Sequence, residues 1–288
     1  MATPLEELIS LFPQTALPIE EGCSQSKAYQ DIVRRGIFPD HPENPFRQSP
    51  EDRLYIKETP VGPVRIVHPH ERQDFVRLVQ VFSHKCEPHG VPDSMGAVIY
   101  FGLVNWNKIR SHKLSYLLGG HKDWGEEFKR FTADPQNYKE NLIMVSSGPY
   151  SALPASHTGM GQEDWIRCSL EIRTLHELTH LVSRTLYPEN QQALRDELVA
   201  DCIGLYGAMK TYDRALAADL LGITPQGYHP GGRLQNYLHP GDSLEEAVEK
   251  CSRALDLLSD QCRKTPDLEP FRLLEIIETE KLGLDLFQ

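Results

Sequence analysis

The sequence predicts an α+β protein with a small mixed or antiparallel sheet and a mainly helical C-terminal lobe. Three observations support this class. The strand-like segments all lie before residue 147, whereas helical periodicity dominates after residue 164. The 288 residues suffice for one large domain or two lobes with a sizeable core. A hydrophobic fraction of 40% and a charged fraction of 25% are ordinary for a globular protein, which excludes disorder or a fibre for the whole chain.

The first half of the chain mixes short helices with apolar, β-branched runs. A proline-rich connector over residues 39–45 prevents continuous helix and is expected as extended surface chain. The elements expected before residue 148 are an amphipathic piece over Pro4–Phe12, helices over Ser26–Arg35, Glu71–Lys85 and Trp106–Leu118, and strands over Val64–Val67, Ala97–Phe101 and Asn141–Ser146.

The second half begins with a loop rich in Gly, Pro and Ser over Gly148–Asp164, and loops of this length are often functional. The elements expected after it are helices over Trp165–Leu186, from the N-cap Asn190 to about Lys210, Tyr212–Leu221, Ser243–Asp260 and Leu268–Lys281, with a loop over Gly227–Gly241. We therefore divide the chain into an N-terminal segment (1–52), an α+β lobe (53–182) and a helical lobe (183–288) of one domain.

Charge and composition exclude several classes of protein. The net charge of −11, without basic runs, argues against binding to nucleic acid and against a polybasic membrane-surface protein. No segment has the roughly 20 apolar residues that span a bilayer, and the first residues do not resemble a signal peptide. Six scattered cysteines without a C-x-x-C pair are expected as reduced, mostly buried thiols. We expect a soluble cytoplasmic protein, and nothing in the sequence indicates its oligomeric state.

The segment His176-Glu177-Leu-Thr-His180 carries the chemistry. Its H-E-x-x-H spacing places two imidazoles on one helix face, about 5–6 Å apart at Cβ, where they can bind one metal ion. Glu177 projects roughly 100° around the helix, close enough to take a proton from a metal-bound water.

A second acidic segment, Asp196-Glu197-Leu-Val-Ala-Asp201, lies on the next predicted helix. From His180 the chain rises about 9 Å to Leu186, and after the turn it descends about 10 Å to Glu197. Glu197 therefore arrives level with His180 as the third ligand, and Asp201 level with His176 as an acceptor for its distal N–H. Asp196 or Asp201 as the third ligand are the alternatives; otherwise Asp196 is expected as a solvated acid of the first helical turns.

These residues resemble the zincin metallopeptidases. The string from Thr174 to Val182 is similar to the extended zincin signature, and Glu197 to Asp201 is similar to the E-x-x-A-D element of gluzincins, in which glutamate is the third zinc ligand. The resemblance covers residues 170–205. It implies one Zn²⁺ ion held by His176, His180 and Glu197, and a sheet packed on the H-E-x-x-H helix. The third histidine of metzincins is absent from the sequence.

The resemblance also implies a donor for the oxyanion of the substrate, downstream of the third ligand. The candidates are Tyr228, His229, Arg233 and Tyr237. From the chain order of zincins we expect the strand Asn141–Ser146 at the edge of the sheet, where it would pair with an extended peptide, and residues 148–161 as a flap.

Two classes of function follow. The first is a zinc-dependent hydrolase, most directly a metallopeptidase acting on a peptide or protein, with Glu177 as general base and then general acid. The second is a zinc-stabilised regulatory or binding protein without turnover, which a fourth protein ligand such as His157 or His229 would favour. A third interpretation is a plain helical bundle in which the H-E-x-x-H motif arose by chance. It requires that the matching spacing of Glu197 and Asp201 also arose by chance.

Overall fold

The computed structural model describes residues 2–39, 42–230, 232–280, 282 and 284. The chain is α+β, as the sequence predicts, and it divides into two compact units. Unit 1 contains residues 1–57 and 63–147, and unit 2 contains residues 58–62 and 148–288. These units are defined by packing, and unit 2 contains both the H-E-x-x-H helix and the helices that follow it. The three segments expected from composition stay a prediction. No helix among the described residues is long and apolar enough to cross a membrane.

Unit 1 is built around a four-stranded mixed sheet with the strand order β1-β2-β4-β3. β1 and β2 are antiparallel, β2 and β4 are parallel, and β3 and β4 are antiparallel. The strands are β1 (Arg53–Lys57), β2 (Val64–His68), β3 (Ala97–Val104) and β4 (Lys139–Val145). The expectation that the strand Asn141–Ser146 lies at the sheet edge is wrong, because β4 has a hydrogen-bonded neighbour on each side.

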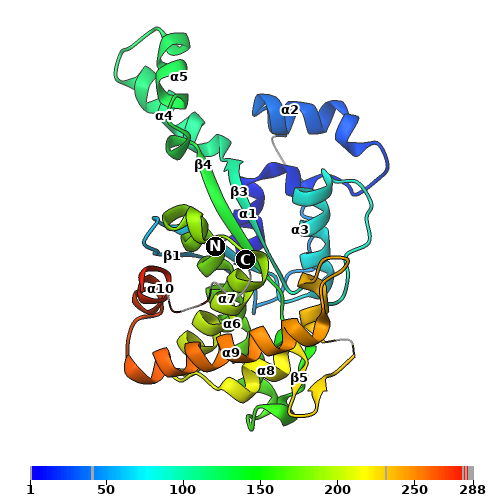
Figure 1. Cartoon of the computed structure of the whole chain (residues 1–288). Coiled ribbons are helices and arrows are strands. Elements are labelled where there is room, and N and C mark those ends of the chain that lie inside the picture. Colours follow the sequence, from blue (N-terminus) through cyan, green and yellow to red (C-terminus); the bar gives the residue numbers. More distant parts are fainter. Residues whose placement is uncertain (1, 40–41, 231, 281, 283, 285–288) are drawn as a thin grey trace. The chain divides into compact units, whose positions relative to one another are not determined.

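Helices cover one face of this sheet and extend its end. Apolar side chains of α1 and α3 pack with Val67, Leu142 and Met144 of the sheet in one core cluster. α4 follows β3 directly and α5 precedes β4, so both lie at the same end of the long β3–β4 pair (Figure 1). The helices of unit 1 are α1 (Pro4–Leu11), α2 (Lys27–Arg35), α3 (Arg72–His84), α4 (Trp106–Leu118) and α5 (Trp124–Thr132). Within the connector over residues 39–45, positions 40 and 41 lie outside the described residues.

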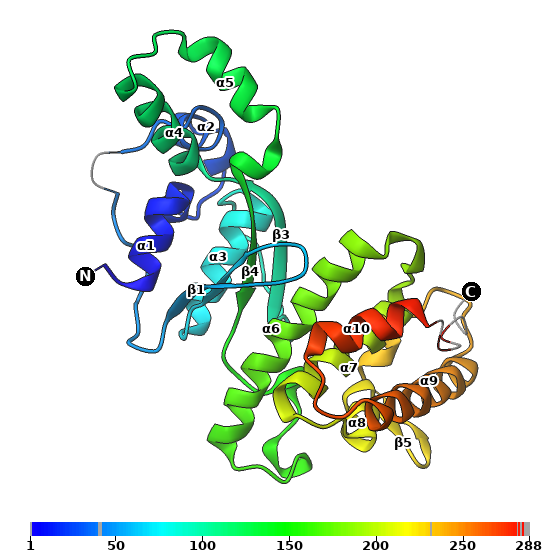
Figure 2. The same ribbon diagram turned by 90° about the vertical axis from the view of Figure 1, so that its left-hand side faces the viewer.

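Unit 2 is mainly helical, and a large cluster of buried apolar side chains lies in its core. α6 and α7 pack along each other, and α9 and α10 pack against α7 (Figure 2). The helices are α6 (Gln162–Leu186), α7 (Ala193–Met209), α8 (Arg214–Leu221), α9 (Leu244–Lys264) and α10 (Pro270–Thr279), and the short strands β5 (Ile223–Thr224) and β6 (Gly227–Tyr228) form a hairpin. Position 281, the expected end of the last helix, lies outside the described residues.

The turn between α6 and α7 differs from the predicted one. Pro188–Asn190 forms a short 3-10 helix, and α7 begins two residues later than expected, because its N-cap is Gln192. Asn190 is not the N-cap, because its amide donates hydrogen bonds to the side chain and backbone of Glu278 on α10. The turn is thereby attached to α10, and Glu197 lies in the second turn of α7.

Candidate metal centre

Two imidazole rings of α6 converge on one point. His176 and His180 lie one helical turn apart, and their Nε2 atoms are 3.0 Å apart. The exposed fractions of the two side chains are only 9% and 11%. Buried imidazoles with converging nitrogens are the arrangement that the H-E-x-x-H spacing predicts for two ligands of one metal ion.

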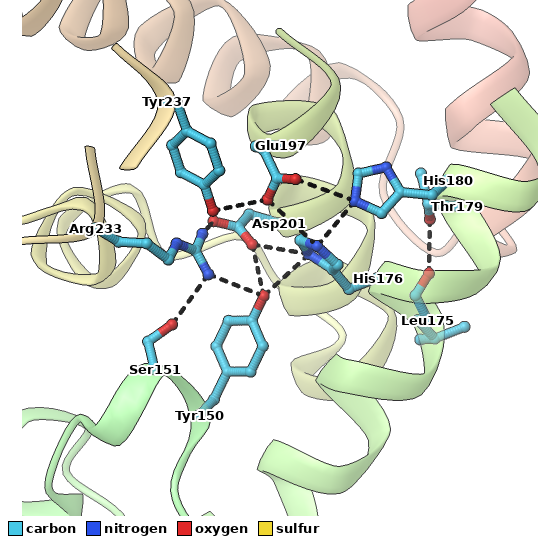
Figure 3. A network of polar contacts seen from close by, with 10 residues as sticks. All are labelled: Tyr150, Ser151, Leu175, His176, Thr179, His180, Glu197, Asp201, Arg233 and Tyr237. Atoms are coloured by element: carbon cyan, nitrogen blue, oxygen red, sulfur yellow. Dashed lines mark hydrogen bonds and ion pairs between the residues drawn. The ribbon is translucent and has the colours of Figure 1, made fainter. Parts of the chain in front are cut away.

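Glu197 of α7 completes a group of three potential ligands. Its Oε1 lies 3.4 Å from Nε2 of His180, and its Oε2 lies 3.5 Å from Nε2 of His176 (Figure 3). The close approach of the two helices requires a small residue at Gly204, where an added Cβ would lie 3.0 Å from the backbone oxygen of Ile172. The structure thus brings Glu197 beside both histidines, as the helical spacing predicts, while its role as a ligand stays a prediction.

The distances between these three groups fit zinc. A tetrahedral zinc ion with bonds of about 2.1 Å to nitrogen and oxygen holds its ligand atoms about 3.4 Å apart. The two Nε2 atoms are 3.0 Å apart, and each oxygen of Glu197 approaches a different histidine, Oε1 that of His180 at 3.4 Å and Oε2 that of His176 at 3.5 Å. With one atom taken from each residue, the three potential ligand atoms lie within 4.8 Å of one another. Two imidazoles and one carboxylate are also a donor set that catalytic zinc uses, with the fourth position open to water or substrate.

Asp201 lies one turn further along α7 and contacts the other nitrogen of His176. Its Oδ1 is 3.0 Å from Nδ1 of His176, and its Oδ2 forms an ion pair with Arg233. An acceptor at Nδ1 selects the tautomer whose Nε2 is free to bind a metal. The Asp201 side chain is only 3% exposed, so the positive charge of Arg233 compensates for burying the carboxylate.

Tyr150 also belongs to this network, and sequence reasoning missed it. Its hydroxyl donates a 2.6 Å hydrogen bond to Oδ1 of Asp201 and lies 3.0 Å from Nδ1 of His176. The loop that carries Tyr150 is fixed by Arg173, which donates to the carbonyl oxygens of Gly148 and Pro149 at 2.9 and 2.7 Å. The sequence did contain a signal for Tyr150, because it is an aromatic residue with a hydroxyl in a loop that was already expected to be functional.

Two of the four candidate oxyanion donors lie in the network. Arg233 contacts Asp201, the hydroxyl of Tyr150 at 3.3 Å and the hydroxyl of Ser151 at 3.0 Å. The Tyr237 hydroxyl donates a 2.9 Å hydrogen bond to Oε2 of Glu197.

The other two candidates, Tyr228 and His229, are engaged elsewhere. The Tyr228 hydroxyl donates to the carbonyl oxygen of Gly232, and the backbone N–H of His229 donates to the carbonyl oxygen of Gly222. Within the described chain neither side chain forms a hydrogen bond with the three potential ligands. Their contacts hold together the loop after α8.

Glu177 lies next to His176 on α6 and is half-buried. Among the residues that the structure describes, no hydrogen bond or ion pair occupies its carboxylate. Its oxygens therefore keep the capacity to accept a proton, as a general base requires.

Asp196 differs from the expectation of a solvated acid. Its side chain is only 13% exposed, and burial raises its pKa. The physical reason is the tight packing of the first turn of α7, where the neighbouring Arg195 is also buried.

Burial and charge act against each other at the ligand group. Burial disfavours the imidazolium of His176, but the contacts with Asp201 and Glu197 outweigh it and raise the pKa to about 10. Burial likewise disfavours the carboxylate of Glu197, yet His176 and His180 hold its pKa far below the ordinary value. In the metal-free protein, a proton therefore competes with a metal ion for the imidazole nitrogen of His176.

The same effects act on the surrounding groups. Burial opposes the charge of Asp201, but Arg233 and His176 lower its pKa. Burial raises the pKa of Tyr150 and of Tyr237, so both hydroxyls remain protonated donors.

Comparison with known proteins gives one match. Residues 2–264 fit the model of DUF7005, a family of unknown function. The comparisons with curated proteins and with solved structures found no match. Because the family model covers nearly the whole chain, including every residue of the candidate metal centre, the chain belongs to the DUF7005 family.

Proposed function

We propose that the protein is a zinc-dependent hydrolase with a zincin-like arrangement, and that it cleaves peptide bonds as a metallopeptidase. The observation that carries this proposal is the convergence of His176, His180 and Glu197, whose potential ligand atoms all lie within 4.8 Å of one another. Glu177 beside them supports a hydrolase over a purely structural zinc site, because a structural site needs no general base.

A zinc ion at this site would acidify water and polarise a substrate carbonyl. Glu177 would take the proton of the attacking water on its carboxylate and give it to the leaving amine, acting first as base and then as acid.

The surrounding residues orient the ligands. Asp201 accepts from Nδ1–H of His176 and so directs its Nε2 inward. Tyr237 donates to Oε2 of Glu197, which leaves Oε1 for the metal. Tyr237 and Arg233 remain the candidates for stabilising the oxyanion, since both lie in the network around the ligands, whereas Tyr228 and His229 do not.

The test separates metal binding from turnover. The purified protein is expected to contain about one zinc per chain by elemental analysis, and His176→Ala or Glu197→Ala should lose most of it. Glu177→Gln should retain zinc but cleave a fluorogenic peptide library at least about 100-fold more slowly, because general acid–base catalysis contributes on the order of 10²–10⁴-fold.

Glu163→Gln is the matched control, because it removes an exposed carboxylate from the first turn of the same helix. It should leave both zinc content and cleavage unchanged. A wild-type protein that binds no zinc contradicts the whole proposal. Zinc binding without cleavage of any peptide would instead support the zinc-stabilised binding protein.

A further inference from the structure

A cavity of about 370 Å³ lies in unit 2 beside the candidate metal centre. Its walls are the first turn of α7, the loop over residues 237–242 and the first two turns of α9. This volume is within the range of pockets that bind small ligands or single side chains. None of the roles described so far uses it.

The cavity adjoins the potential zinc ligands through two residues. The ring of Tyr237 forms part of its wall, while the hydroxyl of the same residue donates to Glu197. Ala193, also in the wall, lies one turn before Glu197 on the same face of α7, about 5–6 Å away at Cβ. Successive residues of an extended peptide are about 3.4 Å apart, so a side chain one or two residues from a bond held at the zinc site could enter the cavity.

The lining combines an apolar floor with an excess of negative charge. Leu194 and Ala247 are buried in the floor. Glu246 and Lys250 form an ion pair at 2.6 Å and largely neutralise each other. Asp242 then carries the remaining formal charge of the lining. Among the described residues only its Oδ2 has a hydrogen-bond partner, the backbone N–H of His239 at 2.7 Å.

The lining also offers an acceptor that needs a donor. The Oε1 atom of Gln192 is buried, and no described residue donates a hydrogen bond to it. A buried acceptor without a partner is unfavourable, and a turn of the Gln192 amide toward the cavity would bring it to the N–H groups of a ligand. The apolar floor, the charge of Asp242 and this acceptor together fit an aliphatic stem that ends in a positive group.

We infer that the cavity is a subsite for a lysine or arginine side chain of the substrate, one or two residues from the scissile bond. The inference rests on the proposed peptidase function. The methylene stem packs on Leu194 and Ala247, and the cationic end meets Asp242 and Gln192. The net charge of −11 favours approach of such a substrate.

The test uses the zinc-loaded protein and fluorogenic peptides that carry Lys, Arg, Leu or Glu at each of the two positions on either side of the scissile bond. At one position kcat/KM should be at least about tenfold higher for Lys or Arg than for Leu, as expected for one charge-assisted contact. Asp242→Asn should reduce that ratio severalfold, and Lys250→Gln should increase it. Asp260→Asn, an exposed acid on α9 outside the cavity, should leave it unchanged.

The failures are distinguishable. No cleavage of any peptide by the zinc-loaded protein overturns the proposed function and the inference with it. Cleavage without a basic preference, or with a preference for Glu or Leu, overturns the inference alone. A basic preference that Asp242→Asn and Lys250→Gln leave unchanged also overturns it, because another part of the protein would then bind the side chain.

Discussion

The Tyr150 hydroxyl occupies an unusual position, between a carboxylate and the imidazole of a potential zinc ligand. It donates to Asp201 and lies 3.0 Å from Nδ1 of His176, while Arg233 contacts both Tyr150 and Asp201. Tyr150, Asp201 and Arg233 therefore fix the ring of His176 together. Groups that orient a metal ligand typically affect metal affinity by about 10–100-fold.

The variant Tyr150→Phe is expected to weaken zinc binding by about tenfold, because it removes the hydroxyl and keeps the ring. Competition with a zinc-binding dye measures the affinity. Tyr187→Phe is the control, since the Tyr187 hydroxyl makes no hydrogen bond to the described residues. Equal zinc affinity of the two variants would show that Tyr150 is only a packing residue.

The pKa shifts of the ligand group predict how the zinc-free protein responds to pH. The folded pKa of His176 is raised from 6.5 to about 10, so its stabilising contribution is complete below pH 6.5 and is lost as the pH rises towards 10. The pKa of Glu197 is lowered from 4.5, so its contribution is present above pH 4.5 and is lost as the pH falls below it. The pair therefore stabilises the zinc-free fold most between these two ordinary values.

With EDTA present, the free energy of unfolding should decrease from pH 6.5 towards pH 10, as measured by urea denaturation. Zinc affinity should increase over the same interval, because the proton on His176 must leave before zinc binds. In His176→Ala both pH dependences should be strongly reduced. An unchanged slope in that variant would assign the effect to other groups.

At this scale the sequence is informative only where spacing is periodic. The i, i+4 pairs His176/His180 and Glu197/Asp201 follow from helix geometry alone. Tyr150 lies in a short 3-10 turn before α6, and the sequence there has no helical or strand period from which its position could be predicted. The burial of Asp196 depends on how the whole first turn of α7 packs. The presence of an acidic residue near the start of a helix does not predict that burial.

Among the elements, α10 is attached to the hairpin of α6 and α7 by a buried polar network. Glu278 of α10 accepts from Arg195 at 2.8 Å, from Asn190 at 2.8 Å and from Ser183 at 3.1 Å. The Arg195 and Glu278 side chains are only 8% and 1% exposed. A pair this deeply buried stabilises little by itself, but removing one partner leaves an uncompensated charge.

Glu278→Ala should therefore lower the free energy of unfolding by about 3–5 kcal/mol, and the double variant Arg195→Met with Glu278→Leu should recover most of that loss. Urea denaturation at constant zinc concentration measures both. Glu275→Ala breaks the exposed pair with Arg272 on the same helix and should change stability by less than about 1 kcal/mol. A loss for Glu278→Ala no larger than this control would contradict the prediction.

The prediction of helices and strands succeeded where a hydrophobic period continues over many residues. It failed where the structure of a segment depends on the elements that pack or pair with it. The helices α3, α6 and α9 lie close to their predicted ranges, and each is long enough to repeat its apolar pattern over several turns. The strand β1 and the helix α5 were not predicted. The central position of β4 depends on which strands it pairs with, and this pairing cannot be derived from the order of the strands along the chain.

For the molecule as a whole, the division into two units predicts which part of the chain would be destabilised if zinc, bound as we propose, were removed. The potential ligands and the residues around them all belong to unit 2. Ligand binding stabilises the structure that forms the site, so its removal destabilises the same structure.

Chelation of zinc should therefore raise hydrogen exchange in α6, α7 and residues 148–152, and much less in β2, β4 and α3 of unit 1. Hydrogen exchange with mass spectrometry, with and without EDTA, makes the comparison. The His176→Ala protein is the control and should not respond to EDTA. An equal response of both units in the wild type would contradict the prediction.

The hairpin of α6 and α7 also has a consequence for the order of folding. It holds all three potential ligands on neighbouring helices that follow one another in the chain, so closing it requires only a short loop. Contacts that are local in sequence form early, whereas Arg233 and Tyr237 must return from a later segment. Zinc present during refolding should therefore accelerate the formation of helix before Arg233 and Tyr237 join the site.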